Sequence, residues 1–503
     1  MKTILGTFAG LVLVAALAGY FILVPHLEKQ YADQVAVAID ALPGELTADS
    51  IKAELLGGKV TILGLNGPTT YIDGSEVHVD VERITLSGLN YSALKEPGVA
   101  RVADGIEAVD GTIQVQTGVE GMEQALSQNI TFEKIALNDL TGDVLALSEL
   151  MRSDASRTQI IDCLAGFSIG HAQASGYSNE ADSIVGPMTM SMESFNARNM
   201  SLLSTGESAW TDIRITVVGT EFLSIGRMGL ANCSVPNFFA PLFEAQENGT
   251  EEDLGEEIIA LMEKTPFVFN GLTLEDISFK FMRPEALTVS KIFTDVYVAA
   301  DRFSVKKRVE KLSVPVDLYR NLSLEAAQFA EYYAKPLLLD GSLVLDVTQK
   351  DGKGDILLKE CTVSDPALAF LSLTLDMPYE SESVDRLFAE GADVLLRKGA
   401  IVLEDKGFLA NLFAGEFEAI KAFGLEEEGL NSAEVMRAYA VQLLRSEAEK
   451  VDNDFRKSGL EGLAQLVEAP GRLSISVSPD QPVRMDIETD ANLNAKVEYE
   501  AAQ

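Results

Sequence analysis

The chain of 503 residues is poor in the side chains that carry most metal, redox and nucleophilic chemistry. It has three histidines and three cysteines, and Cys163, Cys233 and Cys361 lie far apart in different segments. An odd, widely spaced set of cysteines provides neither a disulfide framework nor the CxxC spacing of a zinc or redox site. We therefore expect the cysteines to be small buried hydrophobes, and we expect no metal ion and no cofactor.

Positive charge is also scarce. Lysine and arginine number 40 against 77 aspartates and glutamates, which gives a formal net charge of -37. Such a surface repels polyanions and lacks the basic stripe that nucleic-acid binding needs, so nucleic acid is excluded as a partner. Hydrophobic residues make up 47% of the chain. This is enough for a sizeable core, and the acidity is best explained as a solvated surface.

Long hydrophobic runs are absent apart from one, which extends from Ile4 to Val24 without a charged side chain. At 1.5 Å per residue this run covers roughly 30 Å as a helix, which is the thickness of a hydrocarbon core. It predicts a transmembrane anchor whose apolar residues include Ile4, Leu11, Leu13, Phe21 and Val24. Lys2 precedes the run, which places the N-terminus in the cytoplasm and the body outside it. The alternative is a cleaved signal peptide, because Ala16-Leu17-Ala18 fits a small-x-small site.

Most of the remaining sequence alternates apolar and polar residues with a period of two. Val60-Thr61-Ile62-Leu63 and Val77-His78-Val79-Asp80-Val81 are typical stretches, and Gly, Asn and Asp occur between them. This pattern indicates antiparallel strands joined by turns. Helical spacing is predicted for 26–42 and again for 405–467. The sequence Thr250-Glu251-Glu252-Asp253 resembles a capping box and predicts a third helix, which ends before Pro266.

The predicted fold class is mainly β (α+β). We expect a single N-terminal transmembrane helix, then an elongated, bent antiparallel sheet that forms a groove, with a helical segment near the C-terminus. The predicted divisions are an anchor (1–25), an N-terminal β-rich region (26–240), an acidic helical linker (241–265), a second β-rich region (266–404), a helical segment (405–470) and C-terminal strands (471–503).

A second pattern places apolar residues at i, i+2, i+5 and i+7. It occurs as Val79, Val81, Ile84, Leu86 and as Ile130, Phe132, Ile135, Leu137. One extra residue between two short strand segments, as in a β-bulge, would bring all four side chains onto one face. Glu82-Arg83 and Glu133-Lys134 occupy the proposed bulges. Our candidates for lining an apolar groove are Val60, Ile62, Val79 and Val81.

Two motifs point to catalysis or metal binding, and both have a simpler explanation. Gly166-Phe167-Ser168-Ile169-Gly170 fits the nucleophile elbow of hydrolases, but no histidine follows His171 to act as the base. His78, Asp80 and Glu82 share one face of a predicted strand and could ligate a metal. They are better explained as the solvent face of that strand, opposite Val77, Val79 and Val81. We therefore predict that the protein is not an enzyme.

The order of a short cytoplasmic tail, one N-terminal helix and a long, acidic, β-rich body resembles the bacterial AsmA-like envelope proteins. The resemblance is carried by Leu42-Pro43-Gly44-Glu45-Leu46-Thr47, by Gly58-Lys59-Val60-Thr61-Ile62-Leu63-Gly64-Leu65 and by Ile84-Thr85-Leu86-Ser87-Gly88-Leu89. It implies a bent antiparallel sheet with an apolar groove, anchored in the bacterial inner membrane with its body in the periplasm. It also implies a part in moving phospholipid or maintaining the envelope. The helical segment 405–470 departs from that pattern.

Two functions follow as alternatives. In the first, the protein is an anchored, non-enzymatic envelope protein whose groove handles phospholipid. In the second, it is an anchored periplasmic scaffold or assembly factor that binds other envelope proteins and no lipid. A continuous exposed apolar groove would favour the first, and a closed core would favour the second, because a long apolar face must be covered by something.

Overall fold

The structure is a computed structural model that describes most of the chain. The described residues are 32–33, 35–36, 39, 45–54, 58–70, 76–90, 97–117, 126–152, 157–183, 186–237, 261, 264–280, 285–299, 301–381, 393–422, 432–484 and 493–502. The predicted anchor residues Ile4, Leu11, Leu13, Phe21 and Val24 lie outside these ranges, as does most of the predicted linker 241–265. Among the residues that are described, no helix is long and apolar enough to span a membrane.

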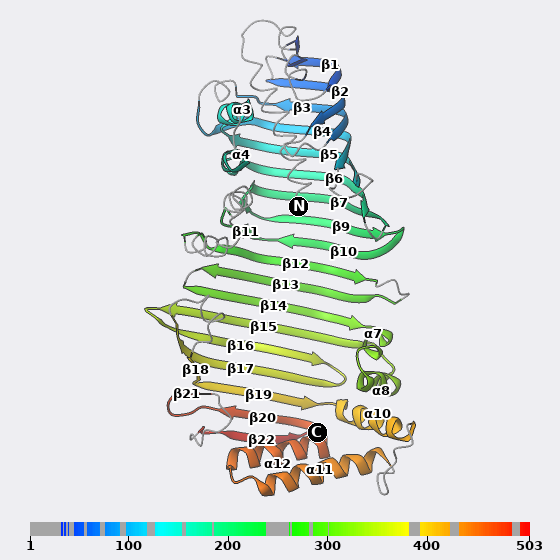
Figure 1. Ribbon diagram of the computed structural model, residues 1–503, viewed down its shortest axis with the longest axis vertical. Helices are drawn as coiled ribbons and strands as arrows, with labels where there is room; N and C mark the ends of the chain where they lie inside the picture. Colours follow the sequence, from blue (N-terminus) through cyan, green and yellow to red (C-terminus); the bar gives the residue numbers. More distant parts are fainter. Residues whose placement is uncertain are drawn as a thin grey trace. The chain divides into compact units, whose positions relative to one another are not determined.

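The chain divides into two compact units, Met1–Gly271 and Leu272–Gln503. Both are built mainly from antiparallel strands, as the alternating sequence predicts (Figure 1). The division falls inside the strand β12 (Phe267–Phe279), a few residues after the predicted linker. The described part of the chain is therefore mainly β, which confirms the coarse fold class.

Unit 1 is an antiparallel meander in which nearly every strand pairs with the next one along the chain. Its elements are β1 (Thr47–Glu54), β2 (Lys59–Thr70), β3 (Glu76–Ser87), β4 (Ala100–Thr117), β5 (Leu126–Gly142), α3 (Val144–Arg152), α4 (Arg157–Ala165), β6 (Ser168–Ser183), β7 (Gly186–Ser201), β8 (Ser204–Thr205), β9 (Ser208–Val217), β10 (Thr220–Leu230) and β11 (Asn232–Ser234). Strand β7 pairs with β9, and β11 pairs with both β8 and the start of β12.

Unit 2 is also built from antiparallel strands, and it carries most of the described helices. Its elements are β13 (Leu287–Ala299), β14 (Arg302–Val314), α7 (Val316–Arg320), α8 (Leu324–Tyr333), β15 (Leu337–Lys350), β16 (Lys353–Asp365), β17 (Ala369–Glu380), β18 (Asp393–Leu396), β19 (Lys398–Asp405), α10 (Phe408–Ala422), α11 (Ala433–Lys450), α12 (Asp454–Glu468), β20 (Gly471–Val477), β21 (Val483–Arg484) and β22 (Lys496–Ala501). The strands pair in the order β13, β14, β15, β16, β17, β19, β20, β22. Helices α10, α11 and α12 lie within 405–470, where helix is expected.

A line of matched irregularities crosses unit 1 and explains the i, i+2, i+5, i+7 pattern. On β3, Glu82 and Arg83 are both exposed, whereas Val81 and Ile84 on either side are both buried. The pairing register between β3 and its neighbours is the same on both sides of Glu82. This is possible because each neighbouring strand also has one unpaired residue at the level of Glu82. These residues are Asp49, Gly64, Glu82, Asp110, Glu133, Gly176, Glu193 and Asp212, and the inter-strand pairing skips each of them.

Alternate members of this line have left-handed backbone conformations. Gly64, Asp110, Gly176 and Asp212 have φ values between +47° and +61°. Glycine adopts this region freely, and aspartate tolerates it better than most residues do. The side-chain alternation therefore shifts by one residue at Glu82-Arg83 and Glu133-Lys134, as predicted, but each shift is matched on the neighbouring strands and is not a bulge of one strand.

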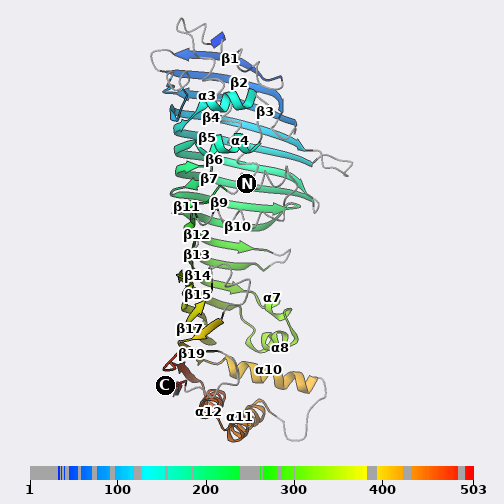
Figure 2. The ribbon, with the colours of Figure 1, turned by 60° about the vertical axis from the view of Figure 1, so that its left-hand side comes forward.

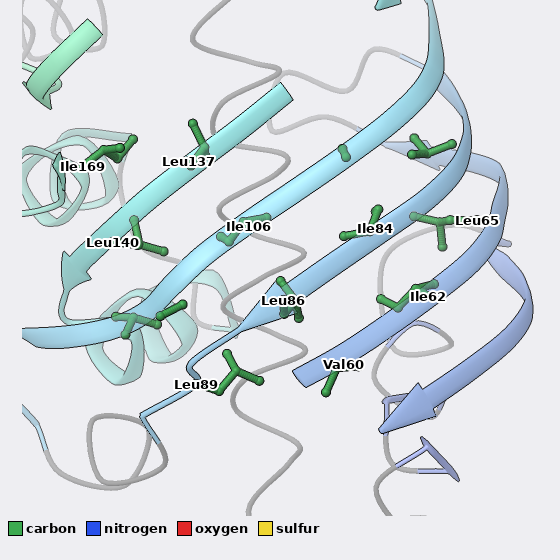
Figure 3. Close-up of a cluster of buried hydrophobic side chains, with 14 of the residues drawn as sticks. Val60, Ile62, Leu65, Ile84, Leu86, Leu89, Ile106, Leu137, Leu140 and Ile169 are labelled. Carbon is green, nitrogen blue, oxygen red and sulfur yellow. The ribbon is translucent and has the colours of Figure 1, made fainter. Parts of the chain in front are cut away.

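The apolar face of unit 1 is a packed core. Side chains from β2 to β6 point to one side of the sheet (Figure 3), and they form one cluster of buried residues. Val144 and Leu147 of α3 belong to the same cluster, and Ile160 of α4 packs against it. Val35 and Ile39, from the segment predicted to be helical, are buried there too. Burial of this kind is the main stabilising term of a β-sheet with one apolar face.

Candidate functional site

The four residues expected to line a groove belong to the core of unit 1. Val60, Ile62 and Val81 leave 1%, 0% and 3% of their surface exposed, and Val79 is half-buried against the same cluster. They do share one face, because Val60 and Ile62 pair with Leu86 and Ile84, which lie on the face of Val81. The expectation of an open trough at these positions is corrected: they belong to, or pack against, one buried cluster that also contains Val35, Ile39 and two residues of α3.

An open apolar face occurs instead in unit 2. Register places Leu343, Cys361, Leu373 and Ile401 side by side across β15, β16, β17 and β19. All four are only half-buried. In the next row, Val363 and Leu371 are 48% and 39% exposed. This is the same type of one-sided apolar face as in unit 1, but here the described residues do not seal it.

This face leads into a cavity of about 690 Å³, which is within the 300–1,000 Å³ typical of small-molecule sites. Its lining residues come from the ends of β15, β16, β17 and β19 and from helices α8, α10 and α12. Figure 2 shows these helices on one side of the strands. The lining comprises Tyr319, Leu322, Ala326, Phe329, Leu337, Leu339, Val363, Ser364, Asp365, Leu368, Ala369, Phe370, Leu371, Leu403, Glu404, Asp405, Phe408, Leu409, Leu412, Leu463, Leu466 and Val467. Its accessible surface is almost entirely carbon.

Aromatic packing holds the helical wall together. The ring of Phe329 on α8 lies 6.2 Å from the ring of Tyr319 and 5.5 Å from that of Phe408 on α10, measured between centroids. Such distances are favourable for aromatic pairs. The Tyr319 hydroxyl donates to the Lys335 carbonyl at 2.8 Å, and burial raises the pKa of this phenol. The tyrosine is therefore a neutral structural group at the end of the cavity.

A close helix crossing brings α8 and α10 together. A Cβ atom on Gly415 of α10 would lie 3.0 Å from the Gln328 carbonyl group of α8. Only glycine allows this approach without a shift of backbone. Ser323 caps α8 by accepting a hydrogen bond from the Ala326 amide at 3.2 Å. These local features set the helices against the open face of the sheet.

Two buried aspartates line the cavity, and their surroundings differ. Asp365 accepts hydrogen bonds on both oxygens, from the Leu338 amide at 2.9 Å and the Ala367 amide at 2.8 Å. Asp405 ends β19 and accepts from the amides of Gly407 and Leu409 through Oδ1, at 3.2 and 3.1 Å. Its Oδ2 is buried and has no hydrogen-bond partner. Burial without a partner is costly for a carboxylate oxygen.

The hydrolase-like motif has a structural explanation. Ser168 begins β6 directly after helix α4, so the chain runs from helix to strand, whereas an elbow runs from strand to helix. Gly170 lies opposite Asp139, and a Cβ atom there would be 2.8 Å from the Asp139 Cβ. The glycine is therefore required by packing. The imidazole of His171 forms a hydrogen bond with the side chain of Asn196, with 2.9 Å between Nε2 and Oδ1.

The other sequence candidates lie on exposed strand faces or are unreactive. His78, Asp80 and Glu82 are exposed, opposite buried Val77 and Val81. No group of residues suited to a metal ion occurs within the described ranges. The three cysteines are free and half-buried, which is less burial than expected. Burial raises the pKa of Cys163 and of Cys233, so both thiols are poor nucleophiles.

Sequence reasoning anticipated the strands and the C-terminal helices but not the cavity between them. Helices α7 and α8, which supply one wall, were not predicted. The Ser323 cap and the apolar residues Phe329 and Ala330 that follow it were the available signal. Comparisons add no further candidates, because no family model matches the chain and no curated protein matches it significantly.

Proposed function

We propose that this chain is a membrane-anchored, non-enzymatic cell-envelope protein that holds the acyl chain of a lipid against the open face of unit 2. The observation that carries the proposal is the carbon-lined cavity of about 690 Å³, continuous with a half-buried apolar strand face. Covering apolar surface of this kind with a hydrocarbon chain instead of water lowers the free energy of the system. The anchor from Ile4 to Val24 and the AsmA-like resemblance support a place at the bacterial inner membrane, with the body in the periplasm.

The test is gentle purification followed by native mass spectrometry and lipid extraction. Leu371 lines the cavity, whereas Leu338 is also exposed but does not line it. Leu371→Gln should reduce bound lipid about tenfold, because roughly 1–2 kcal/mol of apolar contact is lost. Leu338→Gln is the matched control and should retain lipid. Folded wild-type protein that carries no lipid and takes up none from vesicles would refute the proposal.

A second function, binding of an envelope protein as a scaffold, is favoured by one surface. Val435, Tyr439 and Leu443 lie four residues apart on α11 and are all exposed. Residues at this spacing form a single stripe along a helix, suited to a partner helix or groove. Tyr439→Ser together with Leu443→Ser should abolish partner association without changing lipid content, as measured by co-purification of a crosslinked complex. An unchanged set of crosslinks would remove the support for this function.

A further inference from the structure

We infer that the open face of unit 2 takes an amphiphile with an anionic head group such as a phosphate, and that the ammonium of Lys307 holds this head group while the acyl chain extends toward the cavity. This inference rests on the proposed function, because it specifies which lipid the acyl-chain site accepts and how that lipid lies. It is carried by a feature outside the cavity lining: one charged side chain on an otherwise uncharged strand face.

Strand register places Lys307 on the face that leads to the cavity. Lys307 on β14 pairs with Leu343 on β15, so it extends the half-buried apolar row of Leu343 by one strand. Val309, two residues further along β14, pairs with Gly341, which in turn pairs with the cavity residue Val363. Directly paired residues of antiparallel strands project to the same side of the sheet. Lys307 therefore lies on the cavity side, in the row next to that of Val363.

The rest of this face is without charge. Four rows start at the residues of this face between Phe303 and Val309 on β14, and they cross β15 and β16 to reach β17. Lys307 is the only charged residue in these four described rows. Every other member is a valine, leucine, isoleucine, phenylalanine, methionine, cysteine or glycine. A lysine at this place is thus a single positive point on a hydrocarbon surface.

The ammonium of Lys307 is available to a ligand. The residue is exposed, and its side chain has no ion pair with any residue in the described ranges. The adjacent basic residues project to the opposite face and have contacts there. The Lys306 ammonium lies 5.3 Å from the centroid of the Phe293 ring, and Arg308 Nε lies 3.2 Å from Glu310 Oε1.

An occupant of the apolar rows changes the surroundings of this ammonium. In the empty site the lysine stem can lie along its apolar neighbours while the charged end stays in water. An acyl chain that covers the rows displaces part of this water, and a charge left without a partner is then costly. A phosphate removes the penalty, because it brings an opposite charge and acceptor oxygens to a lysine. A hydroxyl compensates less, and a cationic head group repels the lysine.

The local charge also favours an anion, although the whole chain has a net charge of -37. Strand β14 has five basic residues and one acidic residue among its 13. At physiological salt, exposed charges further away than about 8–10 Å are largely screened. The head group therefore meets the positive charge of β14 more than the negative charge of the distant surface.

Strand order sets the path of the acyl chain. Lys307 and Leu371 are three strands apart, which is about 14 Å at the usual strand spacing. This is within the length of an ordinary acyl chain. A chain that starts at Lys307 passes Leu343 and Cys361 before it reaches the cavity. Cys361 is a free, half-buried thiol, and it can therefore report on whether the path is occupied.

The experiment compares three ten-carbon probes by displacement of a fluorescent acyl probe from the purified full chain, in a nonionic detergent at pH 7.5. The probes are decyl phosphate, decanol and decyltrimethylammonium, which are anionic, uncharged and cationic. We expect decyl phosphate to bind about tenfold more tightly than decanol, and the cationic probe to bind most weakly. Decyl phosphate should also slow the alkylation of Cys361 by a maleimide, with Cys163 and Cys233 as internal references. In Lys307→Gln the preference for decyl phosphate over decanol should disappear.

Lys306→Gln is the matched control, since it removes the same charge from the adjacent residue on the opposite face. It should keep the wild-type ranking, with circular dichroism confirming that both variants are folded. Equal affinity for decyl phosphate and decanol in the wild type, or an unchanged ranking in Lys307→Gln, overturns the inference but leaves acyl-chain binding intact. The same holds if decyl phosphate binds without protecting Cys361, or if inorganic phosphate alone displaces the acyl probe. Failure of every probe to bind overturns the inference and the proposed function together.

Discussion

The contrast between a sealed apolar face in unit 1 and an open one in unit 2 predicts very different costs for the same kind of truncation. Ile62 is fully buried on β2, whereas Leu371 on β17 is 39% exposed at the cavity. Ile62→Ala removes buried methyl and methylene groups and leaves a cavity, which should cost about 3 kcal/mol. Leu371→Ala removes atoms that are partly in water already, so the cost should be about 1 kcal/mol or less.

The single tryptophan provides a selective signal for unit 1. Trp210 on β9 packs against Phe195 on β7, with 5.1 Å between ring centroids. Urea unfolding followed by tryptophan fluorescence therefore reports on unit 1, and circular dichroism reports on the whole chain. With a slope of about 3 kcal/mol per molar urea, Ile62→Ala should lower the fluorescence midpoint by about 1 M. Leu371→Ala should leave that midpoint unchanged.

Equal losses of stability for the two variants would mean that Leu371 is as tightly packed as Ile62. The open face, and with it the acyl-chain site, would then be ruled out. A fluorescence midpoint that moves in Leu371→Ala would show that the two units unfold together, and the comparison would then be made by calorimetry.

Three further outcomes follow from particular contacts. Burial alone would raise the pKa of Asp346, but hydrogen bonds from Lys359, Ser304 and Arg302 outweigh it and lower the pKa from 3.8 to about 2. Because the folded-state pKa is the lower one, the stabilisation is fully present above the unfolded-state pKa. It is lost as the pH falls from about 4 to 2. Acid unfolding of Asp346→Asn should therefore be less steep over that interval than that of the wild type, and identical slopes would contradict the assignment. Gly415→Val should push α10 away from Gln328, lowering stability by about 1–3 kcal/mol and weakening acyl-probe binding; unchanged thermal unfolding would argue against the close crossing. A reporter fused after Gln503 should be active only outside the cytoplasm, and the chain should stay in the membrane fraction after alkaline washing; recovery of a soluble chain that begins near Gly19 would identify Ile4 to Val24 as a cleaved signal.

Strands, and the points where their side-chain alternation shifts, are predictable from the sequence because alternation is a local property. Val79, Val81, Ile84 and Leu86 reveal the shift at Glu82-Arg83 through their spacing alone, and the structure places the shift there. Expectations about the C-terminal helices rest on equally local evidence, namely caps and fourfold spacing.

Whether an apolar strand face is sealed or open is not a local property, and this is why buried residues such as Val60 and Ile62 were expected to line an open groove. Val60 on β2 and Leu371 on β17 belong to similar alternating stretches. Whether such a face is sealed depends on distant segments. Val60 shares a buried cluster with Val35, Ile39 and residues of α3, whereas α8, α10 and α12 leave a cavity beside Leu371. The unpaired Oδ2 of Asp405 likewise follows from tertiary packing and has no signature in the sequence.

Crosslinking with a photoactivatable acyl chain tests the central claim most directly. The full-length protein would be exposed to vesicles that contain a phospholipid with a diazirine near the end of one acyl chain, then irradiated, digested and mapped by mass spectrometry. The account predicts that label is concentrated on the peptides that contain Val363, Leu371 and Phe408, and that it is displaced by excess unlabelled phospholipid. Label confined to segments outside the cavity, or label that excess phospholipid does not displace, would contradict it.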